Sequence, residues 1–364
     1  GWGNNKVSAV FGKHLCMLLH RIGQLLPLKQ GHARLEHGNA IVCQGTDGLH
    51  NLVFRDTPEP ELRPRGVIIK MAGAGLNFPD VLQPQGLYQN ILPTPFVSGL
   101  EFSGTVVEAG SECTKLKPGD RVMGLCQGAF APYMSAPEKV CFSVPEAVDL
   151  TDAAALPLSG GTAMLGLAHY GRPHPGETLV VAGASGGTGH FAVQIGKAMK
   201  MRVIALCSTA AKADIARQAG ADGIILTGTD DISQALTDTV GRNGIDIAYD
   251  PVGGDIFDHL RRHMAVDGRL LTVGYASGRI PKLSINRALM NSWSLIGVNW
   301  STTAWNRRPL AERIIGLLLD LVGSGAVRPP ITRRIPLAET IDAIHDMQNR
   351  RSTGKILVDL SSSG

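Results

Sequence analysis

The sequence of 364 residues has few of the features that mark membrane proteins or disulfide-rich proteins. No run reaches the roughly 18 consecutive apolar residues that a membrane-spanning helix needs. The six cysteines are scattered without a Cys-x-x-Cys pair, which excludes the spacing of a disulfide framework or a thiolate zinc site. Aromatic residues are only 5% of the chain, whereas glycine is abundant with 44 residues. This composition is typical of a globular chain of about two domains with many tight turns.

The sequence also lacks a basic excess outside its first segment. The formal net charge is +4, and residues 1–39 account for it with five basic residues against Glu36. Residues 40–364 are balanced, so nothing in them indicates nucleic-acid binding. The run "VFGKHLCMLLHRIGQLLPLK" mixes basic and apolar residues and resembles a transit peptide, which predicts a mitochondrial location. The alternatives are an extra helix or a disordered arm, and the protein would then be cytoplasmic.

The order of strand-like and helix-like patterns divides residues 40–364 into three segments and predicts an α/β protein. Residues 40–158 consist of short β-like runs broken by glycine and proline, which predicts a β-rich domain. Strand and helix patterns alternate over residues 159–303, as in a doubly wound parallel sheet. Residues 304–364 do not extend this alternation, and we expect them to return to the first domain.

The sequence "VVAGASGGTGHFAVQIGK" contains a glycine-rich segment between a predicted strand at 178–182 and a predicted helix from about residue 188. Glycines permit a tight turn and a close approach of the backbone to a pyrophosphate, which the start of the helix attracts. The strand before the loop and the helix after it are the context that this motif requires, although an ordinary tight turn is the alternative. The glycines are Gly183, Gly186, Gly187 and Gly189.

The end of the next strand indicates which dinucleotide binds. Sites for NAD usually have an acidic residue there, which accepts from the ribose 2′-hydroxyl. Here the strand "RVIAL" is followed by "CSTAAK", and no acid comes before Asp214. Ser208, Thr209 and Lys212 offer donors and a positive charge to a 2′-phosphate instead. The sequence therefore favours NADPH, with Lys212 as an ordinary solvated lysine being the alternative.

Several motifs together resemble one family. The order of domains, "GASGGTG", "YDPVGGDIFD", "GRLLTVGYASG" and "STGKILVDL" are similar to those of the zinc-free quinone oxidoreductase branch of the medium-chain dehydrogenases/reductases. The resemblance covers residues 40–364. It implies a GroES-like catalytic domain beside a Rossmann domain, NADPH bound between them, and a homodimer.

The resemblance also assigns cofactor-binding residues. The glycine loop would hold the pyrophosphate, Thr162 the nicotinamide carboxamide, and three later residues the nicotinamide and its ribose. For Thr162 and Tyr275 a packing role is the alternative. The loop residues are Ser185, Gly186, Gly187, Thr188 and Gly189, and the later residues are Gly274, Tyr275 and Asn299.

The ligands of a catalytic zinc are missing from the matching motifs. A catalytic zinc needs three protein ligands, and zinc-dependent relatives have Gly-His-Glu where this chain has "SGLEFSG". Leu100 replaces the histidine, and the segment 73–80 lacks the ligand cysteine. Glu101 is retained, but one carboxylate cannot make the site. We expect no metal.

Without a Lewis acid, hydride transfer to an electron-poor acceptor is the reaction that the resemblance implies. Quinones, enones and enoyl thioesters fit. Reduction of an alkene also needs a proton donor, and "NFPDVLQPQGLY" resembles the segment whose tyrosine has this role in enoyl thioester reductases. Tyr88 would then be the general acid, Asn77 would orient the substrate or nicotinamide, and Asp80 would cap a helix. A packing role for Tyr88 is the alternative.

Three functions compete on this evidence. The first is an NADPH-dependent reductase of quinones or α,β-unsaturated carbonyl compounds. The second is a 2-enoyl thioester reductase, and the third is an NADPH-binding crystallin-like or RNA-binding protein. The presence of Thr162, Tyr88 and the glycine loop favours catalysis, and the balanced charge argues against RNA.

Overall fold

The computed structural model describes residues 38–88, 91–349 and 351–361. The candidate targeting segment lies outside these residues except for Gly38 and Asn39. These two residues open strand β1 (Gly38–Cys43), so the first strand begins two residues before the domain boundary expected at residue 40. No helix in the described part of the chain is long and apolar enough to cross a membrane.

The first half of the chain forms a β-rich unit with two sheets. A three-stranded sheet has the order β2-β1-β4, and a seven-stranded sheet has the order β15-β16-β3-β5-β6-β8, with β7 paired to β3. Most pairs are antiparallel. The other strands are β2 (Leu52–Thr57), β3 (Gly66–Gly75), β4 (Phe96–Val97), β5 (Glu101–Ala109), β6 (Arg121–Leu125), β7 (Tyr133–Pro137) and β8 (Cys141–Ser143).

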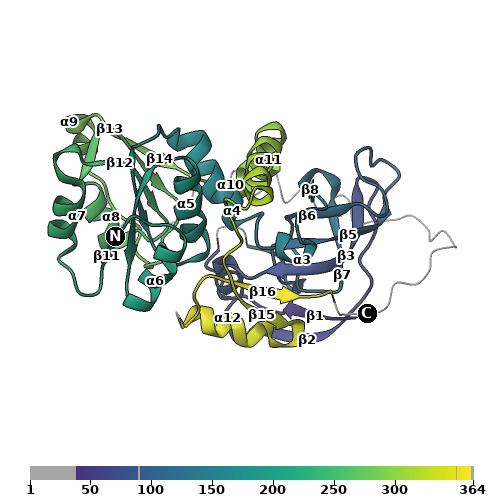
Figure 1. Cartoon of the computed structure of the whole chain (residues 1–364). Helices are drawn as coiled ribbons and strands as arrows, with labels where there is room; N and C mark the ends of the chain where they lie inside the picture. The colour runs from purple at the N-terminus through teal and green to yellow at the C-terminus, as the bar shows by residue number, and fades with distance from the viewer. Residues whose placement is uncertain (1–37, 89–90, 350, 362–364) are drawn as a thin grey trace. The chain divides into compact units, whose positions relative to one another are not determined.

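The closing strands belong to this seven-stranded sheet. β16 (Lys355–Asp359) pairs antiparallel with β3 and parallel with β15 (Ile331–Pro336). Helix α12 (Thr340–Gln348) connects the two strands, and Figure 1 shows it lying beside them in yellow. The closing strands are thus part of the sheet that contains β3 and β5. Helix α11 (Arg308–Gly323) differs, because it packs against α4 (Ser159–Met164) and its inner face shares a core cluster with the parallel sheet.

The middle of the chain forms a six-stranded parallel sheet with the order β11-β10-β9-β12-β13-β14. Numbered along the chain, this is the order 3-2-1-4-5-6 of the Rossmann fold. The crevice for a dinucleotide in this fold lies at the carboxyl ends of the strands, where the order reverses between β9 and β12. The strands are β9 (Thr178–Ala182), β10 (Arg202–Cys207), β11 (Gly223–Leu226), β12 (Ile245–Asp250), β13 (Met264–Thr272) and β14 (Ser294–Gly297).

Helices follow the strands of the parallel sheet and pack on it (Figure 1). The strands β9 and β12 are buried along their whole length or nearly so, which agrees with a sheet covered on both faces. Residues 159–171 form α4 and a π-helical turn at Leu165–Gly171. The remaining helices are α2 (Phe78–Leu82), α3 (Leu150–Ala153), α5 (Gly187–Ala198), α6 (Ala210–Gln218), α7 (Ile232–Val240), α8 (Gly254–Leu260), α9 (Asn286–Asn291) and α10 (Trp300–Asn306).

Candidate active site

The glycine loop has the geometry expected of a pyrophosphate cradle. It follows β9 directly and opens α5, a helix of 12 residues. Gly183 has a φ of 58°, and a Cβ on Gly189 would lie 2.3 Å from the Gly183 carbonyl oxygen. Glycine is thus required at both positions, for the turn and for its close packing on the helix. Gly186 is exposed, and the first N–H groups of α5 have no acceptors within the helix. The loop therefore fits a dinucleotide diphosphate.

Two of the loop's side chains have partners inside the protein. The Thr188 hydroxyl lies 2.5 Å from the Tyr249 hydroxyl and donates to the Ser159 carbonyl at 3.2 Å. Burial raises the pKa of Tyr249, so this phenol stays protonated. Ser185 is buried, and its carbonyl accepts from the Gly354 N–H at 3.1 Å. These contacts join the loop to α4, to β12 and to the residue before β16.

The residues expected at the 2′-phosphate lie together at the end of β10. The Lys212 ammonium donates to the Ser208 hydroxyl at 3.3 Å, and Ser208 is exposed. Thr209 has a different role, because its hydroxyl accepts from the Lys212 N–H and caps α6. The nearest acid along the chain, Asp214, forms an ion pair with Arg217 at 2.6 Å. The arrangement leaves a lysine and a serine side by side after the second strand of the Rossmann order.

The residues expected at the nicotinamide come from three segments. Thr162 is half-buried in α4, and its hydroxyl donates to the Leu158 carbonyl at 2.6 Å. Tyr275 is 41% exposed beyond the end of β13. Asn299 is exposed and caps α10, where its side chain accepts from the Thr302 N–H at 2.9 Å. Contacts of these residues with a nicotinamide remain predictions.

Gly274 and Tyr275 follow β13 beside the loop after β12. A Cβ on Gly274 would lie 3.3 Å from the Pro251 carbonyl oxygen, so the two loops pack closely. At the end of β12, Asp250 is fully buried, and one of its oxygens accepts from the Val252 and Gly253 N–H groups at 2.9 Å. Burial raises the pKa of Asp250. Its role in the structure is to fix the loop that faces Gly274 and Tyr275.

Four polar residues distant in the sequence form a buried polar cluster that sequence reasoning missed as a unit. The Lys355 ammonium lies 2.5 Å from Glu101 Oε2, 2.5 Å from Asn77 Oδ1 and 3.5 Å from the Ser159 hydroxyl. All four residues are at most 7% exposed. Lys355 comes from β16, Glu101 from β5, Asn77 from the turn before α2, and Ser159 from α4. The signal that was present is a lysine that opens the apolar strand "KILVD".

Within the buried polar cluster, Asn77 uses its whole amide. Its Nδ2 donates to the Gly75 carbonyl at 3.0 Å and to Glu101 Oε2 at 2.9 Å. Its Oδ1 accepts from Lys355 and lies 3.5 Å from the Ser159 hydroxyl. An amide has two donors and two acceptor positions, so these contacts fill its capacity. The orientation of a substrate by Asn77 remains a prediction, and the contacts themselves show that Asn77 is rigidly held.

Asp80 lies beside the cluster and acts as the helix cap expected from the sequence. It is 1% exposed, and its Oδ2 accepts from the Asn77 N–H at 2.7 Å. Burial raises the pKa of Asp80 from its ordinary value of 3.8 to about 7, although the Asn77 hydrogen bond and the Lys355 charge lower it. Tyr88 follows six residues after Leu82, the last residue of α2, and is half-buried. The segment 75–88 therefore connects the buried polar cluster to the candidate proton donor.

Glu101 is fully engaged by protein groups. Its Oε1 accepts from the Leu158 N–H at 2.6 Å, and its Oε2 accepts from Asn77 and Lys355. The carboxylate that this chain shares with the Gly-His-Glu motif of zinc-dependent relatives is thus paired with an ammonium group. Among the described residues, no three His, Cys, Asp or Glu side chains lie where they would hold a metal ion.

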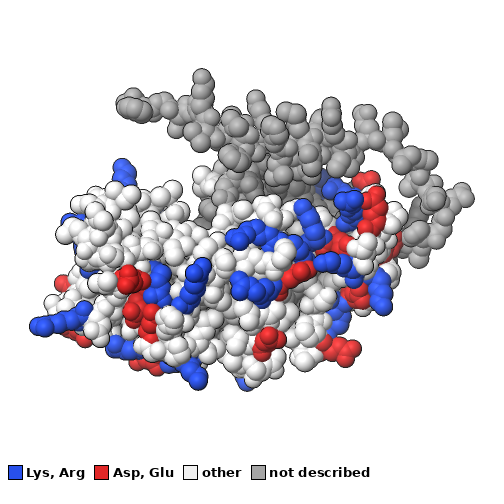
Figure 2. Space-filling view, turned by 90° about the horizontal axis from the view of Figure 1, so that it is seen from above, with Lys and Arg blue, Asp and Glu red and all other residues white. Residues whose placement is uncertain are grey.

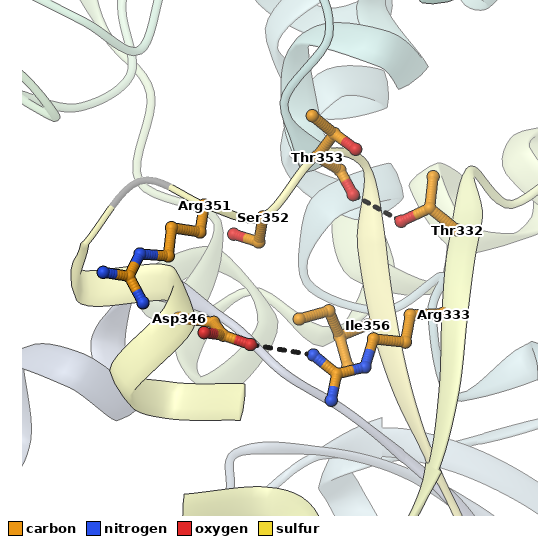
Figure 3. Close-up of a pocket in the computed structure, with 7 residues that line it drawn as sticks. All are labelled: Thr332, Arg333, Asp346, Arg351, Ser352, Thr353 and Ile356. Carbon is orange, nitrogen blue, oxygen red and sulfur yellow. Dashed lines mark hydrogen bonds and ion pairs between the residues drawn. The ribbon is translucent and has the colours of Figure 1, made fainter. Parts of the chain in front are cut away.

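A pocket of about 180 Å³ lies on the other face of β16 (Figure 3). Ile356 lines it, and successive residues of a strand point to opposite faces, so Lys355 points away from it. Figure 3 shows Asp346 paired with Arg333, at 2.9 Å, and Thr332 bonded to the Thr353 carbonyl. This pocket is separate from the residues that the sequence assigned to the cofactor.

Comparison with known proteins agrees with this geometry. Residues 187–315 match the zinc-binding dehydrogenase family, and residues 63–146 match the alcohol dehydrogenase GroES-like domain. The chain is 35% identical over 306 residues to quinone oxidoreductase-like protein 2 of Bos taurus, covering 84% of this chain and 87% of the relative. The chain belongs to the quinone oxidoreductase branch of the medium-chain dehydrogenases/reductases.

Two solved structures extend the comparison over most of the chain. A mycobacterial protein complexed with NADPH is 29% identical, has a TM-score of 0.82, and covers 88% of this chain and 99% of its own. A quinone oxidoreductase of Pseudomonas syringae is 26% identical, with the same TM-score and coverage. The predicted GroES-like domain and Rossmann sheet are confirmed, and the protein is an oxidoreductase that uses a nicotinamide cofactor.

Proposed function

We propose that the protein is an NADPH-dependent, metal-independent reductase that transfers a hydride to quinones or α,β-unsaturated carbonyl compounds. The observation that carries the cofactor choice is the pair of Ser208 and Lys212 at the end of β10, where an NAD site would have an acid. The mycobacterial relative complexed with NADPH supports the same choice. When bound, the reduced nicotinamide supplies the hydride.

The residues of the chain divide the remaining tasks. The glycine loop and the start of α5 bind the diphosphate, and Lys212 neutralises the 2′-phosphate. Thr162, Tyr275 and Asn299 come from the segments that would flank the nicotinamide. Metal independence is supported by Leu100 in the ligand position and by the ammonium that already pairs with Glu101. Such a site suits an acceptor that is electron-poor before it binds.

Tyr88 distinguishes the two acceptor classes. Reduction of a quinone yields a hydroquinone whose oxygens take protons from water. Reduction of an enone yields an enolate that must be protonated at carbon, and Tyr88 is the candidate donor. An enoyl thioester would need the same proton, so this second function shares the site and differs only in the acyl group that it must accommodate.

The test is a panel of acceptors with the full chain. NADPH oxidation is followed by absorbance with 1,4-benzoquinone, 9,10-phenanthrenequinone, a medium-chain enone and crotonyl-CoA, and each reaction is repeated with NADH. We expect turnover with the quinones or the enone, and faster turnover with NADPH than with NADH. Turnover of crotonyl-CoA alone would favour the enoyl thioester reductase. Binding of NADPH without turnover of any acceptor would contradict the proposal.

We further propose that the protein assembles with a second copy of itself through β14. This strand is the last in the parallel sheet, so its outer edge has no partner strand in the described residues. Leu295 on β14 is 43% exposed, and Leu289 and Met290 on the neighbouring α9 are 81% and 70% exposed. An unpaired strand edge is a template for pairing with another chain, and adjacent exposed apolar side chains favour such a contact.

Light scattering after size-exclusion chromatography tests the assembly. We expect a dimer for the wild type and a monomer for Leu295→Lys, because a charge on an edge strand opposes pairing. Leu317→Lys is the control, since Leu317 is 40% exposed on α11. A monomeric wild type would refute this proposal, and so would a dimer of Leu295→Lys.

A further inference from the structure

The buried polar cluster links two parts of the candidate active site that are far apart in the sequence. On one side, Asn77 begins the segment 75–88 that leads to Tyr88. On the other side, Ser159 accepts through its carbonyl from the Thr188 hydroxyl in the first turn of the glycine-loop helix. Lys355 lies in the middle and contacts Asn77, Ser159 and Glu101.

The position of Lys355 along the glycine loop adds a second connection. Its Cδ lies 4.0 Å from where a Cβ on Gly187 would be, so its stem passes beside the loop. The residue before it, Gly354, donates its N–H to the Ser185 carbonyl at 3.1 Å and forms a β-bridge with Gly186. Gly354 and Lys355 therefore both lie against the glycine loop, and Lys355 also contacts Asn77.

Hydrogen bonds hold the Lys355 ammonium group in one position. Lys355 has three N–H groups and three oxygen partners, and it is 2% exposed. The space is also tight, because a Cβ on Gly75 would lie 2.2 Å from Glu101 Oε2 and 2.9 Å from Lys355 Cε. The side chains of Glu101 and Lys355 therefore pack directly against the backbone of Gly75.

Stability alone does not account for this pair. Removing two charges from water is costly, and replacing both members of a buried ion pair by well-packed hydrophobic residues of similar volume often leaves stability unchanged or raises it. An interaction that contributes little to stability but fixes one geometry is suited to keeping active-site groups in their correct relative positions. Misplacement of reacting groups by about 1 Å costs on the order of 10²-fold in rate.

We propose that Lys355 is a positioning residue that holds Asn77 against the start of the glycine-loop helix and thereby aligns the segment carrying Tyr88 with the bound cofactor. The proposal rests on the proposed reductase function for its kinetic consequence. Its structural consequence, a segment 75–88 whose order depends on Lys355, is independent of that function.

The test compares two double variants with the wild-type full chain. Lys355→Met with Glu101→Gln removes the charged pair of the cluster without leaving one buried charge alone. Arg269→Met with Glu177→Gln is the matched control. It removes a two-point ion pair at 2.6 and 3.0 Å whose side chains are less than 20% exposed and which lies outside the cluster.

Hydrogen exchange of the backbone amides is measured with and without NADPH. We expect NADPH to slow the exchange of residues 76–82 in the wild type. In the Lys355→Met, Glu101→Gln variant we expect faster exchange over these residues and no such protection by NADPH. The control variant should behave as the wild type over these residues. The melting temperature of the cluster variant should stay within a few degrees of the wild type.

Kinetics then separate positioning from binding. We expect kcat of the cluster variant to fall about 10- to 100-fold, with the KM for NADPH changed by less than about threefold. The isotope effect of NADPH deuterated at the transferred position should rise, because hydride transfer becomes slower than product release. A purely structural role would change the melting temperature and the cofactor affinity without this isotope effect.

Two results would overturn the proposal. In the first, the exchange and kinetics of the cluster variant match those of the control. In the second, the melting temperature of the cluster variant and its affinity for NADPH both fall, which shows a structural role. If the wild type reduces no acceptor, the reductase function is wrong, and the exchange comparison still decides whether Lys355 orders the segment.

Discussion

Asp80→Asn should change how the stability of the protein depends on pH. Asp80 is 1% exposed, its Oδ1 has no hydrogen-bond partner among the described residues, and burial raises its pKa from 3.8 to about 7. Below pH 3.8 the folded and unfolded chains both carry the proton. Between pH 4 and pH 7 the folded chain keeps a proton that the unfolded chain has released, so the free energy of unfolding falls as the pH rises.

The size of this effect follows from the rise in pKa. Each pKa unit corresponds to about 1.36 kcal/mol, so the rise to about 7 removes about 4 kcal/mol of stability by pH 8. Asparagine stays uncharged and can still accept from the Asn77 N–H. At about 2.1 cal/mol/K per residue over 364 residues, 4 kcal/mol corresponds to roughly 5 °C in melting temperature.

Calorimetry at pH 5, 6, 7 and 8 measures the difference between Asp80→Asn and the wild type. About 2.6 kcal/mol of this loss falls between pH 5 and pH 8, so we expect the difference to move in favour of the variant by roughly 3 to 4 °C across this range. Asp231→Asn controls for the loss of a carboxylate at a helix start, because Asp231 is exposed and caps α7. If the Asp80→Asn difference is as flat with pH as that of the control, or moves in favour of the wild type, the reasoning is refuted.

Four further predictions concern the cofactor and the reaction. Gly189→Ala should abolish NADPH binding in a fluorescence titration and lower the melting temperature, because its Cβ would lie 2.3 Å from the Gly183 carbonyl oxygen. Lys212→Ala should raise the KM for NADPH and leave that for NADH nearly unchanged; equal changes would exclude a 2′-phosphate contact. Tyr88→Phe should keep quinone kcat within a few-fold and lower enone kcat by ~10²–10⁴-fold, and equal losses on both would remove Tyr88 as the proton donor. Activity should survive dialysis against EDTA, whereas stoichiometric zinc in elemental analysis would contradict metal independence.

The glycine loop was predictable because its signals are local. A strand, a glycine turn and a helix within about 20 residues mark the loop, and the residues after the next strand are the basis for the proposed choice of cofactor. The structure places Ser208 and Lys212 together as this local pattern implies. Asp80 was likewise predicted as a cap, since a capping contact joins residues three positions apart.

The cluster around Lys355 was not predictable in the same way. Its contacts join residues separated by 196, 254 and 278 positions, and no periodic pattern marks such partners. Helix α11 shows the same limit, because its packing against α4 joins segments that are distant in the sequence.

Periodicity and turn residues were enough to establish a β-rich unit followed by alternating strands and helices, and a loop for a dinucleotide. These features depend on neighbours within one or two elements, which a single sequence records directly. Which polar side chains meet in the interior, and with what pKa, depends on how elements from three regions of the chain pack. For Asn77, Glu101 and Lys355 the packing of β16, β5 and the turn before α2 brings the three side chains together, and no local pattern in the sequence records contacts over such separations.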